Sequence, residues 1–240
     1  MPRVTDPPSC ELLGRLLSVV AHDLRNPLSA VQSNVCYLAT ARRDVGADER
    51  EALADALASC DGLANLIDSL ELLSQWLTED AARAAETVRV AEVVTDVLAR
   101  HRAAASSHGV ELRSDPSAED EGLQVHANRE MFARALANLL RNCIQHSRSG
   151  GVVRVLARRE GGRCVVVVAD HGARMAAELA EVAFQAEGQL VAKGNAHGRY
   201  GRGLGLYCAH LSALLAGAAV AVGEPPPPAS NAFELSAPWE

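Results

Sequence analysis

The stretch AHDLRNPLSAV, from Ala21 to Val31, places a histidine beside an acid within a run whose apolar spacing predicts a helix. Asn26 lies one turn after His22 on the same helical face. Pro27 cannot donate a backbone N–H and clashes with the preceding turn, so we expect a bend there. An ordinary solvated histidine is the alternative, but the acid (Asp23), the amide and the proline together favour a functional one.

Two further polar groups lie in the second half of the chain. Asn138 and Asn142 share one face of a predicted helix, and their carboxamide oxygens suit a hard cation such as Mg²⁺. Taken alone, such a pair is more often polar surface.

Asp170 follows a run of four valines and should lie at the end of a buried strand, where a carboxylate can accept a hydrogen bond from a nucleobase amino group. Gly172 would allow a flat ring to approach, although an ordinary Asp-x-Gly turn is the alternative.

A third candidate is the glycine-rich stretch GRGLGLYCAHL, in which Gly201, Gly203 and Gly205 precede or open a helix. Backbone N–H groups at a helix N-terminus bind phosphate, and glycines allow close approach. The stretch matches neither a Walker A motif nor a dinucleotide-binding fingerprint. A flexible loop is the alternative.

The elements that must position His22 are two long helices. The first is expected from a cap at Ser9 to about Arg42, and the second from about Asp48 to Leu77. His22 lies about 200° from its apolar neighbours, so it should face solvent. A single hairpin cannot bury both apolar stripes, so we predict a dimeric four-helix bundle, or packing on the rest of the chain. The stripe of the first helix is Leu16, Val20, Leu24, Leu28, Val31, Val35 and Leu38.

After a polar linker at 78–87 the pattern changes to alternating strands and helices. A helix capped by Asn128 is followed by a two-stranded hairpin that turns at Glu160-Gly161-Gly162. The glycine-rich helix and two closing strands complete the chain. The predicted class is α+β: a helical hairpin in residues 1–82, followed in residues 87–240 by an α/β sandwich with helices on one face of a mixed sheet.

The composition narrows the classes of function. A net charge of -7 argues against nucleic acid as the main partner. Six scattered cysteines without metal spacing favour core thiols in a reducing compartment. No run is long and apolar enough to span a membrane, and the N-terminus is unlike a signal peptide. We therefore expect a cytoplasmic chain without a membrane segment.

In this order and spacing, the stretches resemble the sensor histidine kinases. AHDLRNPLSA resembles their H-box, NLLRNCIQHS the N-box, ADHGAR the first glycine box and GRGLGL the second. Phe184 occupies the place of the F-box aromatic. The resemblance implies a dimerisation and histidine phosphotransfer domain followed by a Bergerat-type ATP-binding domain.

The resemblance also implies a role for each matching residue. His22 would take the γ-phosphoryl group of ATP as a neutral imidazole, Asp23 would accept a hydrogen bond from its other ring nitrogen, and Asn26 would position water for dephosphorylation. The phosphoryl group would pass to an aspartate of a response regulator. Asn142 would coordinate Mg²⁺, and Asp170 would recognise adenine. The remaining nucleotide contacts would come from Asn138, His146, Gly172, Gly201, Gly203, Leu204 and Gly205.

Two departures from the family pattern leave an alternative open. Arg174 stands where the first glycine box usually has a second glycine, and Gln145 stands where the N-box often has a cation. Both favour a degenerate, non-catalytic dimeric scaffold whose ATP site has decayed. The retained Asn142, Asp170 and glycine-rich stretch favour the kinase.

Overall fold

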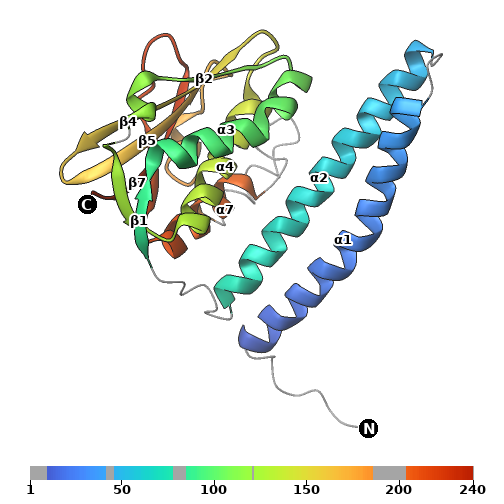
Figure 1. The fold of residues 1–240 in the computed structure, drawn as a ribbon, viewed down its shortest axis with the longest axis horizontal. Coiled ribbons are helices and arrows are strands. Elements are labelled where there is room, and N and C mark those ends of the chain that lie inside the picture. The colour runs from blue at the N-terminus through green and yellow to red at the C-terminus, as the bar shows by residue number, and fades with distance from the viewer. Residues whose placement is uncertain (1–9, 42–45, 78–84, 121, 186–203, 240) are drawn as a thin grey trace. The chain divides into compact units, whose positions relative to one another are not determined.

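The computed structural model describes residues 10–41, 46–77, 85–120, 122–185 and 204–239 (Figure 1). The chain divides into two compact units, Met1–Ala81 and Ala82–Glu240. The first is helical and the second combines helices with sheet, as the sequence predicts. The expected cap at Ser9 and the helix end at Arg42 lie outside the described residues.

The first unit is a hairpin of α1 (Cys10–Ala41) and α2 (Ala47–Leu77). Its buried seam joins Ala21 and Leu28 of α1 to Cys60 and Ile67 of α2. Each pair is seven residues apart, which keeps both members on one helical face. Pro27 lies within α1, and the helix continues on both sides of it.

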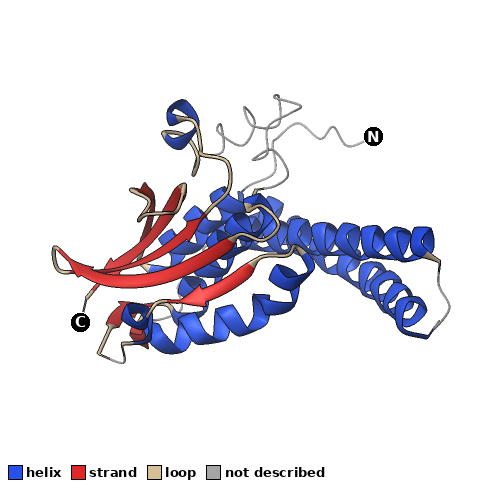
Figure 2. Ribbon diagram, turned by 90° about the horizontal axis from the view of Figure 1, so that it is seen from above, coloured by secondary structure: helices blue, strands red, loops and turns tan. Residues whose placement is uncertain are grey.

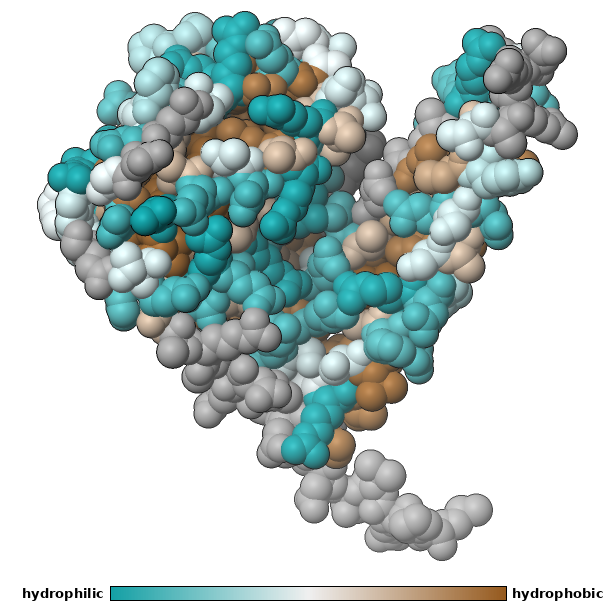
Figure 3. Space-filling model, in the orientation of Figure 1, coloured by the Kyte–Doolittle hydropathy of each residue, from teal (hydrophilic) through white to brown (hydrophobic). Residues whose placement is uncertain are grey.

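Most of the predicted apolar stripe of α1 does not pack on α2. Leu16, Val20, Leu24 and Val31 are 47–52% exposed, whereas Ala21 is fully buried. Figure 3 shows hydrophobic residues at the surface along the hairpin. Helical spacing establishes which side chains share a face, but the small Ala21 lets α2 approach on a neighbouring face. Within one chain the hairpin therefore buries only Leu28 of this stripe and leaves most of it exposed, as expected of a hairpin that cannot bury both stripes by itself.

The second unit contains a five-stranded mixed sheet in the order β2-β4-β5-β7-β6, with β2 parallel to β4 and the other pairs antiparallel. Helices cover one face, as predicted (Figures 1 and 2). One difference is that β1 and β3 form a separate antiparallel pair. The elements are β1 (Glu86–Arg89), α3 (Val90–Ser107), β2 (Glu111–Ser114), η1 (Pro116–Glu119), β3 (Gln124–Ala127), α4 (Arg129–His146), β4 (Val152–Glu160), β5 (Arg163–Asp170), α5 (Ala177–Ala180), α7 (Gly205–Ala216), β6 (Ala219–Gly223) and β7 (Asn231–Pro238).

The core lies between α4 and the middle of this sheet. Val166 and Val168 of β5 lie opposite Leu235 and Phe233 of β7, and all four side chains are buried. Alternation along β5 turns Val165 and Val167 to the other face, where they form a second, smaller apolar cluster. Both faces of β5 are therefore buried, which is why its sequence is a continuous run of valines.

Among the described residues, no helix is both long enough and apolar enough to cross a membrane.

Candidate functional site

His22 lies on the solvent side of α1. Its side chain is 75% exposed, as the helical spacing predicts, and that of Asp23 is 72% exposed. His22 Nδ1 is 3.5 Å from Asp23 Oδ1, longer than a normal hydrogen bond. The carboxylate therefore lies beside Nδ1, and Nε2 is the ring nitrogen farther from it. Asn26, one turn later, is also exposed.

The segment around His22 is fixed to the second helix by a neighbouring side chain. Arg25 donates to Asp68 Oδ1 at 2.6 Å and also to Glu71, both on α2. These hydrogen bonds and charges raise the pKa of Arg25, the bond to Glu71 having the largest effect. Arg25 faces α2 while His22 faces solvent, so one helical turn combines an anchor with an accessible imidazole.

Helix α4 carries three polar side chains of the predicted nucleotide site. Asn128 caps the helix by accepting from the Met131 N–H at 3.1 Å. Asn138, Asn142 and His146 follow at four-residue spacing, and each is at most 8% exposed. They therefore form a polar line on a buried helix, and the reading of Asn138 and Asn142 as ordinary polar surface is wrong.

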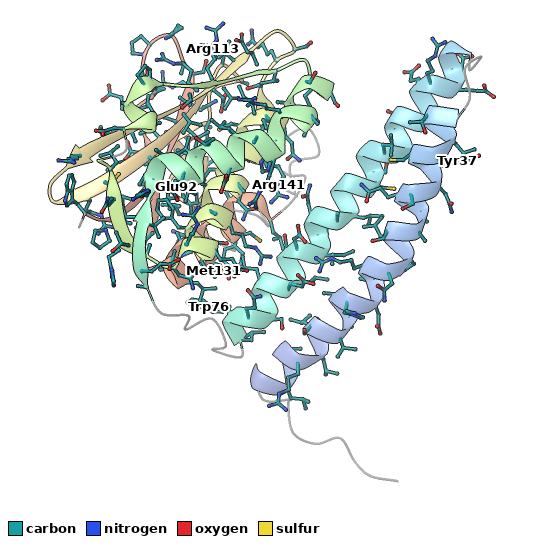
Figure 4. All side chains as sticks on the ribbon, in the orientation of Figure 1. Tyr37, Trp76, Glu92, Arg113, Met131 and Arg141 are labelled. Carbon is teal, nitrogen blue, oxygen red and sulfur yellow. The ribbon has the colours of Figure 1, made fainter. Side chains whose placement is uncertain are left out.

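The two carboxamides of this line differ in their partners. Asn138 Oδ1 accepts a hydrogen bond from Arg141, which is labelled in Figure 4. Asn142 Nδ2 is buried and has no hydrogen-bond partner among the described residues. An unpartnered buried amide costs free energy unless a ligand or water completes it. Asn142 is consequently the better placed of the two to bind an incoming group.

Asp170 lies at the end of β5 and is fully buried. Its Oδ1 accepts from the Gly172 N–H at 2.6 Å and from Asn231 Nδ2 at 3.0 Å, while Oδ2 has no hydrogen-bond partner among the described residues. Burial raises the pKa of Asp170, and the two hydrogen bonds partly offset this effect. Cys143 on α4 is the buried thiol beside it, and its pKa is raised by burial and by the Asp170 charge.

Gly172 is required by the packing of the protein itself. A Cβ built on this residue would lie 2.4 Å from the His146 carbonyl oxygen and 2.8 Å from Asp170 Oδ1. The missing side chain therefore lets the segment after β5 pack against the end of α4. This reason differs from the predicted one, the approach of a flat ring.

Asn231 is a buried site residue that the sequence analysis missed. It is 4% exposed and lies opposite Asp170 in the β5–β7 pairing. Besides contacting Asp170, its amide accepts from the Met175 N–H at 2.8 Å and donates to the Ala173 carbonyl at 3.0 Å. A polar residue at the start of an apolar closing strand was the available signal, but its partner is distant in sequence.

The glycine-rich stretch is described only in part. Gly201 and Gly203 lie outside the described residues, whereas Leu204 and Gly205 form the start of α7. The Asn128 N–H donates to the Ala216 carbonyl at 3.2 Å, which joins the beginning of α4 to the end of α7. Because the two helices pack side by side, the start of α7 is directed toward the Asn138–His146 half of α4.

These groups fit a purine nucleotide better than they fit a metal ion held by protein alone. Asp170 Oδ2 is an orphaned acceptor and Asn142 Nδ2 an orphaned donor, both buried near the end of α4 and β5. Within the described residues no cluster of three His, Cys, Asp or Glu side chains could hold a metal. Mg²⁺ commonly takes one or two protein ligands and completes its shell with phosphates and water. A magnesium ion here would depend on such phosphates.

Each of the two units matches a known domain family. Residues 12–79 match the His Kinase A (phospho-acceptor) domain, and residues 127–239 match the histidine kinase-, DNA gyrase B- and HSP90-like ATPase domain. The chain belongs to the sensor histidine kinase family. The first match contains His22 and Asn26, and the second contains the polar line of α4 and Asp170.

The chain is also similar in sequence to individual sensor histidine kinases. The chain is 27% identical over 166 residues to the sensor-like histidine kinase SenX3 of Mycobacterium tuberculosis H37Rv, covering 69% of this chain and 40% of SenX3. It is 29% identical over 198 residues to the sensor histidine kinase ZraS of Escherichia coli K12, covering 82% of this chain and 40% of ZraS. The chain thus spans about two fifths of the length of these relatives.

The fold of the chain is also similar to that of solved kinases. Full-length ShkA, solved in complex with AMPPNP, has a TM-score of 0.60 at 21% identity, covering 94% of this chain and 46% of ShkA. The ring of Phe184, the residue that the resemblance assigns to the F-box, lies edge-on to Phe233 at 6.3 Å between centroids.

Proposed function

We propose that the chain is an ATP-dependent protein-histidine kinase that phosphorylates His22 and passes the phosphoryl group to an aspartate of a response regulator. The observation that carries the proposal is a histidine exposed on an anchored helix, in a chain that also has a buried acceptor suited to adenine. Two-component signalling then follows from the family to which the chain belongs.

In this proposal His22 Nε2 attacks the γ-phosphorus of ATP, a P–N bond forms, the bond to the bridging oxygen breaks, and ADP leaves. Asp23, beside Nδ1, stabilises the positive charge that develops on the ring. Asn142 would offer its side-chain carbonyl oxygen as one ligand to a magnesium ion, and the ion would neutralise phosphate charge. Asn138 and His146 would line the pocket, and Leu204 and Gly205 would approach the phosphates. Gly201 and Gly203, which lie outside the described residues, are assigned to phosphate binding by the family resemblance alone.

Support for ATP comes from Asp170 and from the structural relative ShkA, which was solved with an ATP analogue. Oδ2 of Asp170 accepts from the amino group of adenine in this arrangement. Gln145 and Arg174 are both exposed, so neither fills the buried part of the site. Their presence is compatible with a functional nucleotide pocket.

We further propose that the chain acts as a homodimer in the cytoplasm, with residues 1–82 forming the dimerisation and phosphotransfer domain and residues 87–240 the ATP-binding domain. The exposed apolar side chains of α1 support pairing with a second copy. The cysteines described are all free thiols, which suits a reducing compartment.

Incubation with γ-labelled ATP and Mg²⁺ tests the kinase. The wild type should gain a label that is lost in acid and retained in base, because a phosphoramidate forms. His22→Ala should remain unlabelled while it folds and binds ATP as before. Undiminished labelling of this variant would remove His22 from its role, and a wild type that does not bind ATP would favour the degenerate scaffold.

A further inference from the structure

The two oxygens of the Asp170 carboxylate are held in different ways. Oδ1 accepts from the Gly172 N–H at 2.6 Å and from Asn231 Nδ2 at 3.0 Å. Oδ2 is buried without a hydrogen-bond partner among the described residues. An acceptor that already has two donors has little capacity for a third, so an incoming donor should go to Oδ2.

Asn231 is itself held in a single orientation. Its Oδ1 accepts from the Met175 N–H, so the amide oxygen must face that segment. Its Nδ2 carries two protons, and they go to Asp170 Oδ1 and the Ala173 carbonyl. A flipped amide would place Nδ2 against the Met175 N–H and Oδ1 against the Ala173 carbonyl, so the backbone determines which end faces Asp170.

We propose that Asn231 is the specificity-determining partner of Asp170: its amide occupies Oδ1 and thereby reserves Oδ2 for the exocyclic amino group of a purine base. The inference rests on the proposed nucleotide function and deepens it. The site is then built for a 6-amino purine, because a 6-oxo purine would set a carbonyl oxygen against a carboxylate oxygen, with no proton between them.

If Gly172 and Asn231 fix the orientation of the side chain at position 170, Asp170→Asn should reverse the preference for the base, whereas simple loss of an acceptor would only weaken binding. In Asp170→Asn, the carbonyl oxygen of the new amide should take the place of Oδ1, because both Gly172 and Asn231 donate there. Its NH₂ group must then take the place of Oδ2, so the acceptor becomes a donor. A donor at that position pairs with the 6-oxo group of guanine and faces the amino group of adenine unfavourably.

Equilibrium binding of ATP and GTP, measured by calorimetry, tests the inference. Wild type should prefer ATP, and Asp170→Asn should prefer GTP. Asn231→Asp replaces the donor with an acceptor, so it should weaken ATP binding at least about tenfold and remove most of the discrimination. The matched control is Asn128→Ala, which removes another buried amide of the same unit, the cap of α4, and should leave the ATP-to-GTP ratio unchanged.

The outcomes separate the two proposals. A wild type that binds neither nucleotide overturns the proposed function and this inference with it. A wild type that prefers ATP, with an Asp170→Asn variant that binds both nucleotides equally weakly, overturns the orienting role alone. Retained discrimination in a folded Asn231→Asp variant would also overturn it, and the Asp170→Asn result stands even if Asn231→Asp fails to fold.

Discussion

Asp170 combines complete burial with an oxygen that has no partner among the described residues, and burial raises its pKa above that of an ordinary aspartate. The fold therefore favours the protonated form of this carboxyl more than an ordinary aspartate does. The stability linked to this group is present below the ordinary aspartate pKa and is lost as pH rises through the raised pKa. Adenine should shift the balance toward the ionised form, because a carboxylate is a stronger acceptor for its amino group than a protonated carboxyl.

We predict that ATP affinity falls as pH decreases from neutral through the raised pKa of Asp170, with proton release on binding in that range. Calorimetry in buffers of different ionisation enthalpy measures this release. Other titratable groups near Asp170 are Cys143 and His146 on α4 and His171 after β5. Asp170→Asn serves as the control, and proton release that persists in this variant would assign the effect to another side chain or to the phosphates of ATP.

Substitution of Asn26 tests whether the exposed face of α1 also takes part in dephosphorylation of the response regulator. Its amide can both donate to and accept from water but has no readily ionised proton, so positioning of a water is its expected role. Asn26→Ala should leave phosphorylation of His22 intact. Loss of label from the phosphorylated response regulator should slow about tenfold or more, roughly 1.4 kcal/mol of barrier. Equal loss of both activities would indicate a damaged helix, and unchanged dephosphorylation would contradict the assignment.

At the scale of elements, two glycines of the site serve different purposes. Gly172 brings the segment after β5 against the end of α4, whereas Gly205 begins α7 with nothing described within 4 Å of a built Cβ. Gly172→Ala should lower the free energy of unfolding by about 1–3 kcal/mol, as overpacking does. Gly205→Ala should leave folding unchanged and weaken ATP binding if phosphate approaches there. Thermal unfolding and calorimetry distinguish the two, and equal stability of both variants would contradict the packing argument.

At the scale of the whole molecule, the exposed apolar stripe of α1 predicts self-association. Leu16 and Val20 are 52% and 47% exposed, which is typical of an interface and costly in water. The double variant Leu16→Glu and Val20→Glu should convert a dimer into a monomer, measured by sedimentation. Ser18→Glu, an exposed position about 200° round the helix from both, should remain dimeric. A dimer that survives the double substitution would place the interface elsewhere.

The hairpin, the order of strands and helices, the cap at Asn128 and the exposure of His22 could all be predicted from the sequence. Each depends on interactions within a few residues: helical spacing, alternation along strands, a side chain bonded to its own helix. The motifs that carry family membership are equally local. Their identification required no knowledge of how distant segments meet.

Other features were decided only by the tertiary structure. Asn231 follows Asp170 by 61 positions, and only the pairing of β5 with β7 brings them into contact. The packing of α4 buries Asn138 and Asn142, and helical spacing alone did not predict their burial. The buried face of α1 depended on where a small residue, Ala21, admits a second helix. In each case the deciding contact joins groups whose proximity local periodicity does not encode, because it arises only when separate elements pack.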